Sequence, residues 1–274
     1  MSVKTDDTGR RWVEVEVEVP GTPEEVWEAI ATGPGVSSWF VPTEEEKGED
    51  GTPTRIISHF GPGMDSIAKI TEWDPPRRFA AESEDLGPEA PPIATEWIVE
   101  ARSGGVCVVR VVHSLFTSSE DWDDQVASWE SGWPGFFRIL RLYLTHFRGL
   151  RGAAAFQVMA MAPEPASEAW DALTTALGLA GAAEGERRST PAGAPPLAGL
   201  IEVVGQNQHD LQLLLRTEEP APGLAHLFAM PMGGQVFLSV RFYLYGETAA
   251  SAVARAEPQW QDWLTAQFAP APLS

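Results

Sequence analysis

Two stretches of the chain align with each other without a gap. VEVEVEVPGTPEEVWEAIAT, residues 13–32, lies on FQVMAMAPEPASEAWDALTT, residues 156–175, with proline, glutamate and tryptophan at matching positions. GGVCVVRVVHSLF, which starts at Gly104, lies in the same way on GGQVFLSVRFYLY, which starts at Gly233. Because both matches occur in the same order along the chain, the sequence predicts a tandem duplication of one structural module. The predicted domains are residues 1–150 and residues 151–274.

The first module should open with a strand followed by a helix. In RWVEVEVEV, residues 11–19, valines alternate with glutamates, a period of two that is typical of a strand with one buried and one solvated face. Thr22 with Glu25 three residues later is a capping-box pattern, and Pro23 suits the first helical position. A helix should therefore begin at Thr22 or Pro23, and the Gly-Pro-Gly of residues 33–35 should end it.

An antiparallel sheet and a long helix should complete the module. The predicted strands are TRIISHF, MDSIAKITEWD, RRFAAESE, TEWIVEAR and VCVVRVVHSLF, separated by turn compositions such as GPG, DPP and SGG. Between Val126 and Phe147 apolar side chains recur every three or four residues, which predicts an amphipathic helix lying across the sheet. Because a proline inside a helix usually bends its axis, Pro134 should leave room beneath this helix.

The second copy differs from the first at two places. It contains the spacer AGAAEGERRSTPAGAPPLAG, residues 180–199, whose Ala, Gly and Pro content predicts a mobile loop. It also carries Phe242 where the first copy carries His113. We therefore expect the second module to be a degenerate copy of the first.

The charge of the chain narrows the range of partners. Its 19 Lys and Arg residues against 39 Asp and Glu residues give a formal charge of -20, which repels nucleic acid backbones and anionic lipid surfaces. MSVKTDDTGRRW lacks the apolar region of a signal peptide, and no run approaches the ~18 apolar residues of a membrane span. We expect a cytoplasmic protein without a nucleic acid or membrane partner. Cys107 is the only cysteine, so we interpret it as a buried small hydrophobe.

Several short motifs follow one another in an order typical of a known family. They are Trp39-Phe40 after the first helix, Pro75-Pro76-Arg77 before a strand, His113-Ser114-Leu115-Phe116 at a strand end and Gly132-Trp133 in the last helix. In this pattern the sequence resembles the START-like superfamily, and within it the branch similar to the activator of heat-shock protein ATPase. The resemblance covers residues 10–150 well and residues 154–270 weakly. Leu115 stands where the family usually has glycine, and Pro134 is uncommon inside this helix. The pocket of this chain can therefore differ in shape from the pocket of the family.

The resemblance implies an α+β fold of two helix-grip modules, each a curved antiparallel sheet wrapped around a long C-terminal helix with a cavity between them. Members of the superfamily mostly bind lipids, polyketides, hormones or other apolar molecules. Some are cyclases or dehydratases, and one branch binds a chaperone and stimulates its ATPase. The fold by itself therefore fixes no function.

A search for catalytic and metal-binding motifs gives little. The chain has no HExxH, and its five histidines show no ligand spacing, so we expect no metal. It has no glycine-rich phosphate loop followed by lysine and no Gly-x-Ser-x-Gly elbow, so we expect no nucleotide, no other cofactor and no serine nucleophile. The carboxylates of residues 44–46 and 121–124 are interpreted as solvated loop residues.

Aromatic side chains carry the clearest functional signal. Many of them fall on segments that should rim or line the first cavity, where a pocket of roughly 300 to 1,000 Å³ is expected. The alternative for each of them is plain core packing. The predicted ligand-binding residues are Trp39, Phe40, His59, Trp97, His113, Phe116, Trp122, Trp129, Trp133 and Phe137.

The alternation of VVRVVHSLF should place Arg110 on the outer face of its strand and His113 on the inner face. General acid-base catalysis would need a second positioned group and a tuned pKa, and the sequence shows neither. We therefore interpret His113 as a polar group of the pocket first and as a catalyst second, and we predict no catalytic residue.

These patterns favour non-catalytic binding of a small apolar or amphipathic ligand in the first module. Three alternatives stay open: a protein-interaction role like that of the ATPase activator, with acidic surfaces meeting a basic partner; a cyclase- or dehydratase-like enzyme acting on a polyketide-type substrate; and a scaffolding dimer. A retained small molecule in native mass spectrometry would separate the binder from the interaction protein.

Overall fold

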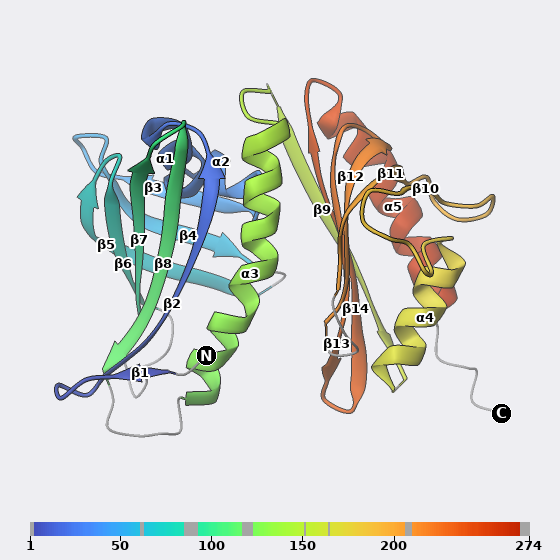
Figure 1. Ribbon diagram of the computed structural model, residues 1–274, viewed down its shortest axis with the longest axis horizontal. Coiled ribbons are helices and arrows are strands. Elements are labelled where there is room, and N and C mark those ends of the chain that lie inside the picture. Colours follow the sequence, from blue (N-terminus) through green and yellow to red (C-terminus); the bar gives the residue numbers. More distant parts are fainter. Residues whose placement is uncertain are drawn as a thin grey trace. The chain divides into compact units, whose positions relative to one another are not determined.

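The computed structural model describes residues 3–60, 63–84, 93–116, 123–150, 152–163, 165–205 and 210–268, and for residues 116 and 123–131 it describes the backbone alone. The chain divides into two compact units, Met1–Arg148 and Gly149–Ser274. Each unit combines an antiparallel sheet with helices (Figure 1). The predicted α+β class is therefore confirmed.

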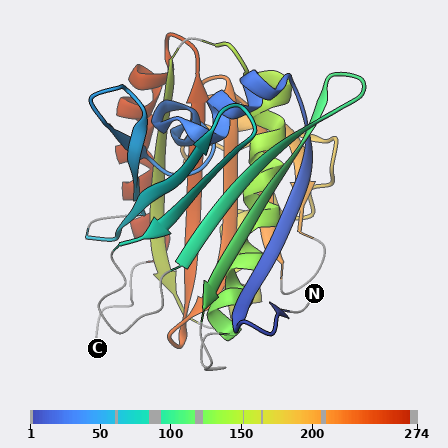
Figure 2. The same cartoon turned by 90° about the vertical axis from the view of Figure 1, so that its left-hand side faces the viewer.

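Among the described residues, the first unit has an eight-stranded sheet in the order β1-β2-β8-β7-β6-β5-β4-β3. The first strand of the predicted module thus pairs with the last one, and in Figure 2 the strands lie side by side in front of α3. The strands are β1 (Lys4–Thr5), β2 (Arg10–Pro20), β3 (Thr43–Lys47), β4 (Pro53–His59), β5 (Asp65–Asp74), β6 (Arg78–Ser83), β7 (Ile93–Arg102) and β8 (Val106–Phe116). The helices are α1 (Pro23–Ala31), α2 (Gly33–Ser37) and α3 (Asp123–His146).

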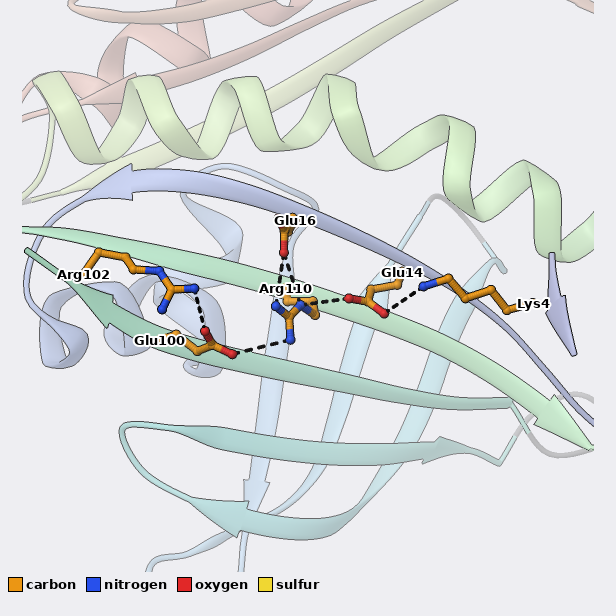
Figure 3. A network of polar contacts seen from close by, with 6 residues as sticks. All are labelled: Lys4, Glu14, Glu16, Glu100, Arg102 and Arg110. Carbon is orange, nitrogen blue, oxygen red and sulfur yellow. Dashed lines mark hydrogen bonds and ion pairs between the residues drawn. The ribbon is translucent and has the colours of Figure 1, made fainter. Parts of the chain in front are cut away.

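The glutamates of the alternating strand face solvent, as their spacing predicts. Arg110 of β8 forms ion pairs with Glu14 at 3.0 Å, with Glu16 at 3.2 Å and, across to β7, with Glu100 at 3.4 Å (Figure 3). Of the valines of the opposite register, Val13 and Val19 are buried, with 2% and 1% of their surface exposed, and Val15 and Val17 are half-buried. Arg110 therefore lies outward and its neighbours at odd positions lie inward, as expected.

Helix α1 begins as predicted, and a second helix follows where only a break was expected. The Thr22 hydroxyl accepts from the backbone N–H of Glu25, and the Glu25 carboxylate accepts from the backbone N–H of Thr22. Thr32 ends α1 and caps α2 through a bond from the Gly35 N–H. A Cβ on Gly35 would lie 1.9 Å from the carbonyl oxygen of Glu28, so the close contact of the two helices requires glycine there.

The carboxylates of residues 44–46 do not lie in a loop, so that interpretation is wrong. They belong to the edge strand β3, which pairs with β4 through registers such as Glu45 with Ile56. An edge strand exposed on one side tolerates consecutive charges because its side chains reach water. Such a strand lacks the alternating apolar residues from which strands are predicted. Of the second carboxylate group, residues 121 and 122 lie outside the described residues, and Asp123 begins α3.

In the second unit the described residues include a six-stranded sheet in the order β10-β11-β12-β13-β14-β9, which again places the first long strand beside the last. The strands are β9 (Ala153–Ala162), β10 (Arg187–Ser189), β11 (Ala198–Val204), β12 (Leu211–Glu219), β13 (Gly223–Met232) and β14 (Gln235–Tyr245), and the helices are α4 (Ala166–Ala176) and α5 (Ala249–Gln267). The aligned stretches therefore form corresponding elements: β8 matches β14, and β2 with α1 matches β9 with α4.

The predicted mobile spacer contains regular structure. Arg187–Ser189 pair with Ala198–Leu200 of β11, and the Thr190 hydroxyl donates to the Pro195 carbonyl while accepting from the Leu197 N–H. Leu197 is buried, with 1% of its surface exposed. Composition alone does not predict this pairing, because β10 is short and Leu197 is surrounded in the sequence by small residues and prolines. The mobility of the spacer stays a prediction.

Candidate functional site

A partly open cavity of about 630 Å³ lies in the first unit between the sheet and its helices. Its wall combines aromatic rings with short side chains, and its volume falls in the predicted range. The helices α1, α2 and α3 contribute to one side, and strands β4 to β8 contribute to the other. The lining residues are Ile30, Val36, Trp39, Phe40, Ile56, Ser58, Phe60, Met64, Asp65, Ser66, Ala68, Phe79, Ala81, Ser83, Ile93, Thr95, Trp97, His113, Gly132, Trp133 and Phe136.

Five of the predicted residues meet at this cavity: Trp39, Phe40, Trp97, His113 and Trp133. The Trp133 ring stacks on Phe40 with centroids 5.3 Å apart and meets the edge of Trp97 at 5.1 Å. Trp39 is held by a 2.8 Å hydrogen bond from its indole N–H to the Ala29 carbonyl. The aromatic wall is therefore interlocked before any ligand enters.

The remaining predicted residues lie elsewhere. Phe137 is buried behind the wall, with its ring 5.4 Å from that of Trp133, so it supports the cavity without lining it. His59 does not line the cavity, and its Nδ1 atom lies 2.8 Å from the carboxylate of Asp65, which does. Trp122 lies outside the described residues, as do the side chains of Phe116 and Trp129.

The structure adds wall residues that the sequence interpretation missed. Phe136 packs against Phe40 with centroids 4.6 Å apart, and Phe60 approaches Phe40 at 5.8 Å. Phe136 follows Trp133 by three residues, so the helical period could have revealed it. No sequence pattern identified the hydroxyls of Ser66 and Thr95, because their positions in the cavity depend on the pairing of Ser66 with Ser58 of β4 and of Thr95 with His113 of β8.

His113 is held from both sides. The indole Nε1 of Trp133 donates to its Nε2 atom at 2.6 Å, and its Nδ1 atom lies 2.9 Å from the Thr95 hydroxyl oxygen. An indole N–H can only donate, so Nε2 accepts, and a neutral imidazole then carries its proton on Nδ1. The Nδ1–H group accordingly donates to Thr95.

The surroundings of His113 keep its ring neutral. Although one side of the ring faces the cavity, burial among protein groups lowers the pKa of His113 from 6.5 to about 4. A general base near neutral pH needs a free lone pair on nitrogen, and the lone pair on Nε2 already accepts from Trp133. His113 in this arrangement is a structural and orienting group, which agrees with its interpretation as a polar group of the pocket.

Asp65 and His59 form an ionisable pair, of which Asp65 lines the cavity. The Asp65 carboxylate lines it and contacts His59, while the opposite nitrogen of His59 is 3.9 Å from the Glu44 carboxylate. Both side chains of the closer pair are partly solvated, with 50% of Asp65 and 35% of His59 exposed. Water therefore reaches both side chains of this pair.

In the second unit an aromatic cluster occupies the corresponding region. Phe242, at the position equivalent to His113, stacks on Phe156 with centroids 4.8 Å apart and meets Trp260 of α5 at 5.2 Å. All three side chains are buried. The replacement of histidine by phenylalanine thus accompanies a packed apolar interior.

The chain is similar to several solved structures. A search of curated proteins found no match. Among solved structures, the di-domain ARO/CYC protein BexL from the BE-7585A biosynthetic pathway is 15% identical, with a TM-score of 0.45 over 96% of this chain and 100% of that one. DynU16, from the dynemicin biosynthetic locus, is 17% identical, with a TM-score of 0.41 over 94% of this chain and 95% of that one. The Aha1 dimer from Colwellia psychrerythraea is 20% identical, with a TM-score of 0.39 over 50% of this chain and 98% of that one.

Within the described residues, no helix combines the length and apolar character needed to cross a membrane. A match to a known family covers most of the first unit, which contains the cavity. Residues 10–138 match the family model described as polyketide cyclase / dehydrase and lipid transport, and this match fits the START-like superfamily that the sequence resembles.

Proposed function

We propose that the first unit is a START-like helix-grip module that binds a small apolar or amphipathic ligand without transforming it. The observation that carries this proposal is the cavity of about 630 Å³ with its interlocked aromatic wall. A pocket of this size, lined mostly by apolar groups and a few polar ones, is typical of small-molecule sites. The second unit, with its packed interior, is proposed to be structural.

The state of His113 supports binding over catalysis. Its two nitrogens are engaged by Trp133 and Thr95, and its lowered pKa keeps it neutral at physiological pH. Proton transfer through His113 would require breaking the bond to Trp133, which also positions the aromatic wall.

One observation favours the alternative of a cyclase- or dehydratase-like enzyme. The Asp65–His59 pair reaches the cavity through Asp65 and could accept or donate a proton, and the matched family model names cyclases and dehydrases beside lipid transport. In that alternative Asp65 and His59, not His113, would be the acid-base groups.

Native mass spectrometry of the freshly purified full chain tests the proposal. We expect a retained small molecule that denaturation releases, together with saturable fluorescence enhancement of the neutral dye N-phenyl-1-naphthylamine. Complete absence of both would contradict binding in the cavity. If the retained molecule loses water or gains a ring on incubation, and Asp65→Asn prevents the change, the enzyme alternative replaces the binder.

A further inference from the structure

We propose that the cavity selects uncharged ligands carrying an acceptor oxygen, such as a carbonyl, and that the hydroxyl of Thr95 donates a hydrogen bond to that oxygen. The inference rests on the proposed function, because it concerns the same cavity. It adds the chemical class of the ligand and the residue that recognises it.

The first argument is the direction of the hydrogen bonds from Trp133 to Thr95. The indole of Trp133 donates to His113, and His113 in turn donates through Nδ1 to the Thr95 oxygen. A threonine hydroxyl has one hydrogen and two acceptor lone pairs. Because one lone pair accepts from His113, the hydroxyl hydrogen is directed away from the imidazole.

The second argument is the place of this hydrogen. Thr95 is part of the cavity wall, on β7 directly opposite His113 of β8. Among the described residues, no acceptor for the Thr95 hydroxyl is found other than the His113 ring, whose Nδ1 is already protonated. A partly buried hydroxyl is more stable by about 1 kcal/mol when it donates a hydrogen bond, so a ligand oxygen in the cavity would be held here. His113 and Trp133 act as positioning residues for this donor.

The third argument is the absence of positive charge around the cavity. None of the described lining residues is lysine or arginine, and Asp65 adds a carboxylate. An anionic ligand would lose its hydration without gaining a cationic partner, which is costly in an apolar site.

Matched naphthalene probes test the selection. Equilibrium dialysis of the full chain at pH 7.5 compares 2-acetylnaphthalene, a neutral ketone, with 2-naphthoate, an anion, and 2-ethylnaphthalene, which has no acceptor. We expect the ketone to bind at least ten times more tightly than the carboxylate. Equal affinity for the two, or tighter binding of a trimethyl(2-naphthyl)ammonium cation, would overturn the preference for uncharged ligands.

Variants test the donor. Thr95→Val keeps the shape of the side chain and should weaken ketone binding roughly three- to tenfold while changing the affinity for 2-ethylnaphthalene by less than twofold. Thr95→Ser retains the hydroxyl and should restore ketone binding. Thr71→Val, which removes an exposed hydroxyl of β5 that does not line the cavity, should leave it unchanged. Equal weakening of both probes by Thr95→Val would contradict a hydrogen bond from Thr95.

A spectroscopic measurement separates this bond from packing effects. The infrared carbonyl band of bound 2-acetylnaphthalene should lie at lower wavenumber in the wild type and in Thr95→Ser than in Thr95→Val. An identical band in all three would overturn the role of Thr95. If none of the four naphthalene probes binds the wild type at all, the proposed function itself fails, which is a different result from loss of selectivity.

Discussion

Trp133 of α3 and His113 of β8 are joined by a 2.6 Å hydrogen bond, with their rings nearly parallel at 18°. This contact ties the long helix to the sheet across the edge of the cavity. It also fixes which nitrogen of His113 carries the proton, and through it the orientation of Thr95.

The lowered pKa of His113 predicts a specific loss of stability in acid. In the unfolded chain His113 takes up a proton near pH 6.5, whereas in the folded chain it does so near pH 4. The stability of the first unit should therefore be fully present above pH 6.5 and should fall as the pH decreases from 6.5 to 4, by at most ~1.4 kcal/mol per pH unit. Urea unfolding at pH 7.5 and pH 5, followed by tryptophan fluorescence, measures this.

His113→Phe is the matched control, because Phe242 occupies the equivalent position of the second unit. This variant should fold and lose less stability between the two pH values than the wild type. The same pH dependence in both proteins would mean that other groups cause the loss.

Removing the ring of Trp133 should weaken ligand binding strongly. Trp133 lines the cavity and contacts Phe40, Trp97 and His113, so Trp133→Ala removes part of the wall and leaves His113 without its donor. Binding of N-phenyl-1-naphthylamine should weaken by about tenfold or more, which corresponds to a loss of ~1.4 kcal/mol or more of binding free energy, because the apolar contact of the indole with the dye is lost. Trp263→Ala in α5 is the control and should change the affinity by less than twofold; similar losses in the two variants would place the dye outside the cavity.

The first unit should fold when it is expressed alone. Its sheet is hydrogen-bonded within residues 1–150, and the elements of the second unit form a separate sheet. A fragment of residues 1–150 should give a strand-rich circular dichroism spectrum and a single cooperative urea transition. An unfolded fragment from a full chain that unfolds cooperatively would mean that the two units depend on one core.

Trypsin distinguishes two expectations for the spacer. Its composition predicts early cleavage after Arg187 or Arg188, whereas the pairing of β10 with β11 predicts late cleavage. We expect late cleavage in the wild type and faster cleavage in Thr190→Val, which loses the bonds of the Thr190 hydroxyl to Pro195 and Leu197. Mass spectrometry of the first fragments gives the answer; immediate cleavage of the wild type at these arginines would favour the mobile spacer.

Local patterns in the sequence predicted much of the fold. The alternation in residues 11–19 and the capping box at Thr22 depend on neighbouring residues, and both elements form as expected. Strand β3 escaped prediction because its consecutive glutamates are compatible with an edge strand only once β4 is in place.

The candidate site was predictable only in part. Aromatic residues on cavity-facing segments could be selected from the pattern of motifs, and Trp133 and Trp97 do meet in the wall. The role of Thr95 could not be predicted, because it depends on the register that sets Thr95 opposite His113. His59 was misplaced because its inward or outward direction at the end of β4 is decided by the contact with Asp65.

The central claim, that a ligand occupies the cavity of the first unit, is tested most directly by filling the cavity. Ala68 of β5 lines it, whereas the next residue, Lys69, is exposed on the opposite face of the strand. Titration of N-phenyl-1-naphthylamine into the wild type, Ala68→Trp and Lys69→Trp compares a filled cavity with a matched surface change. We expect saturable binding to the wild type and to Lys69→Trp, and at least a tenfold weaker affinity for Ala68→Trp with an unchanged circular dichroism spectrum. Equal binding to all three proteins would contradict the claim.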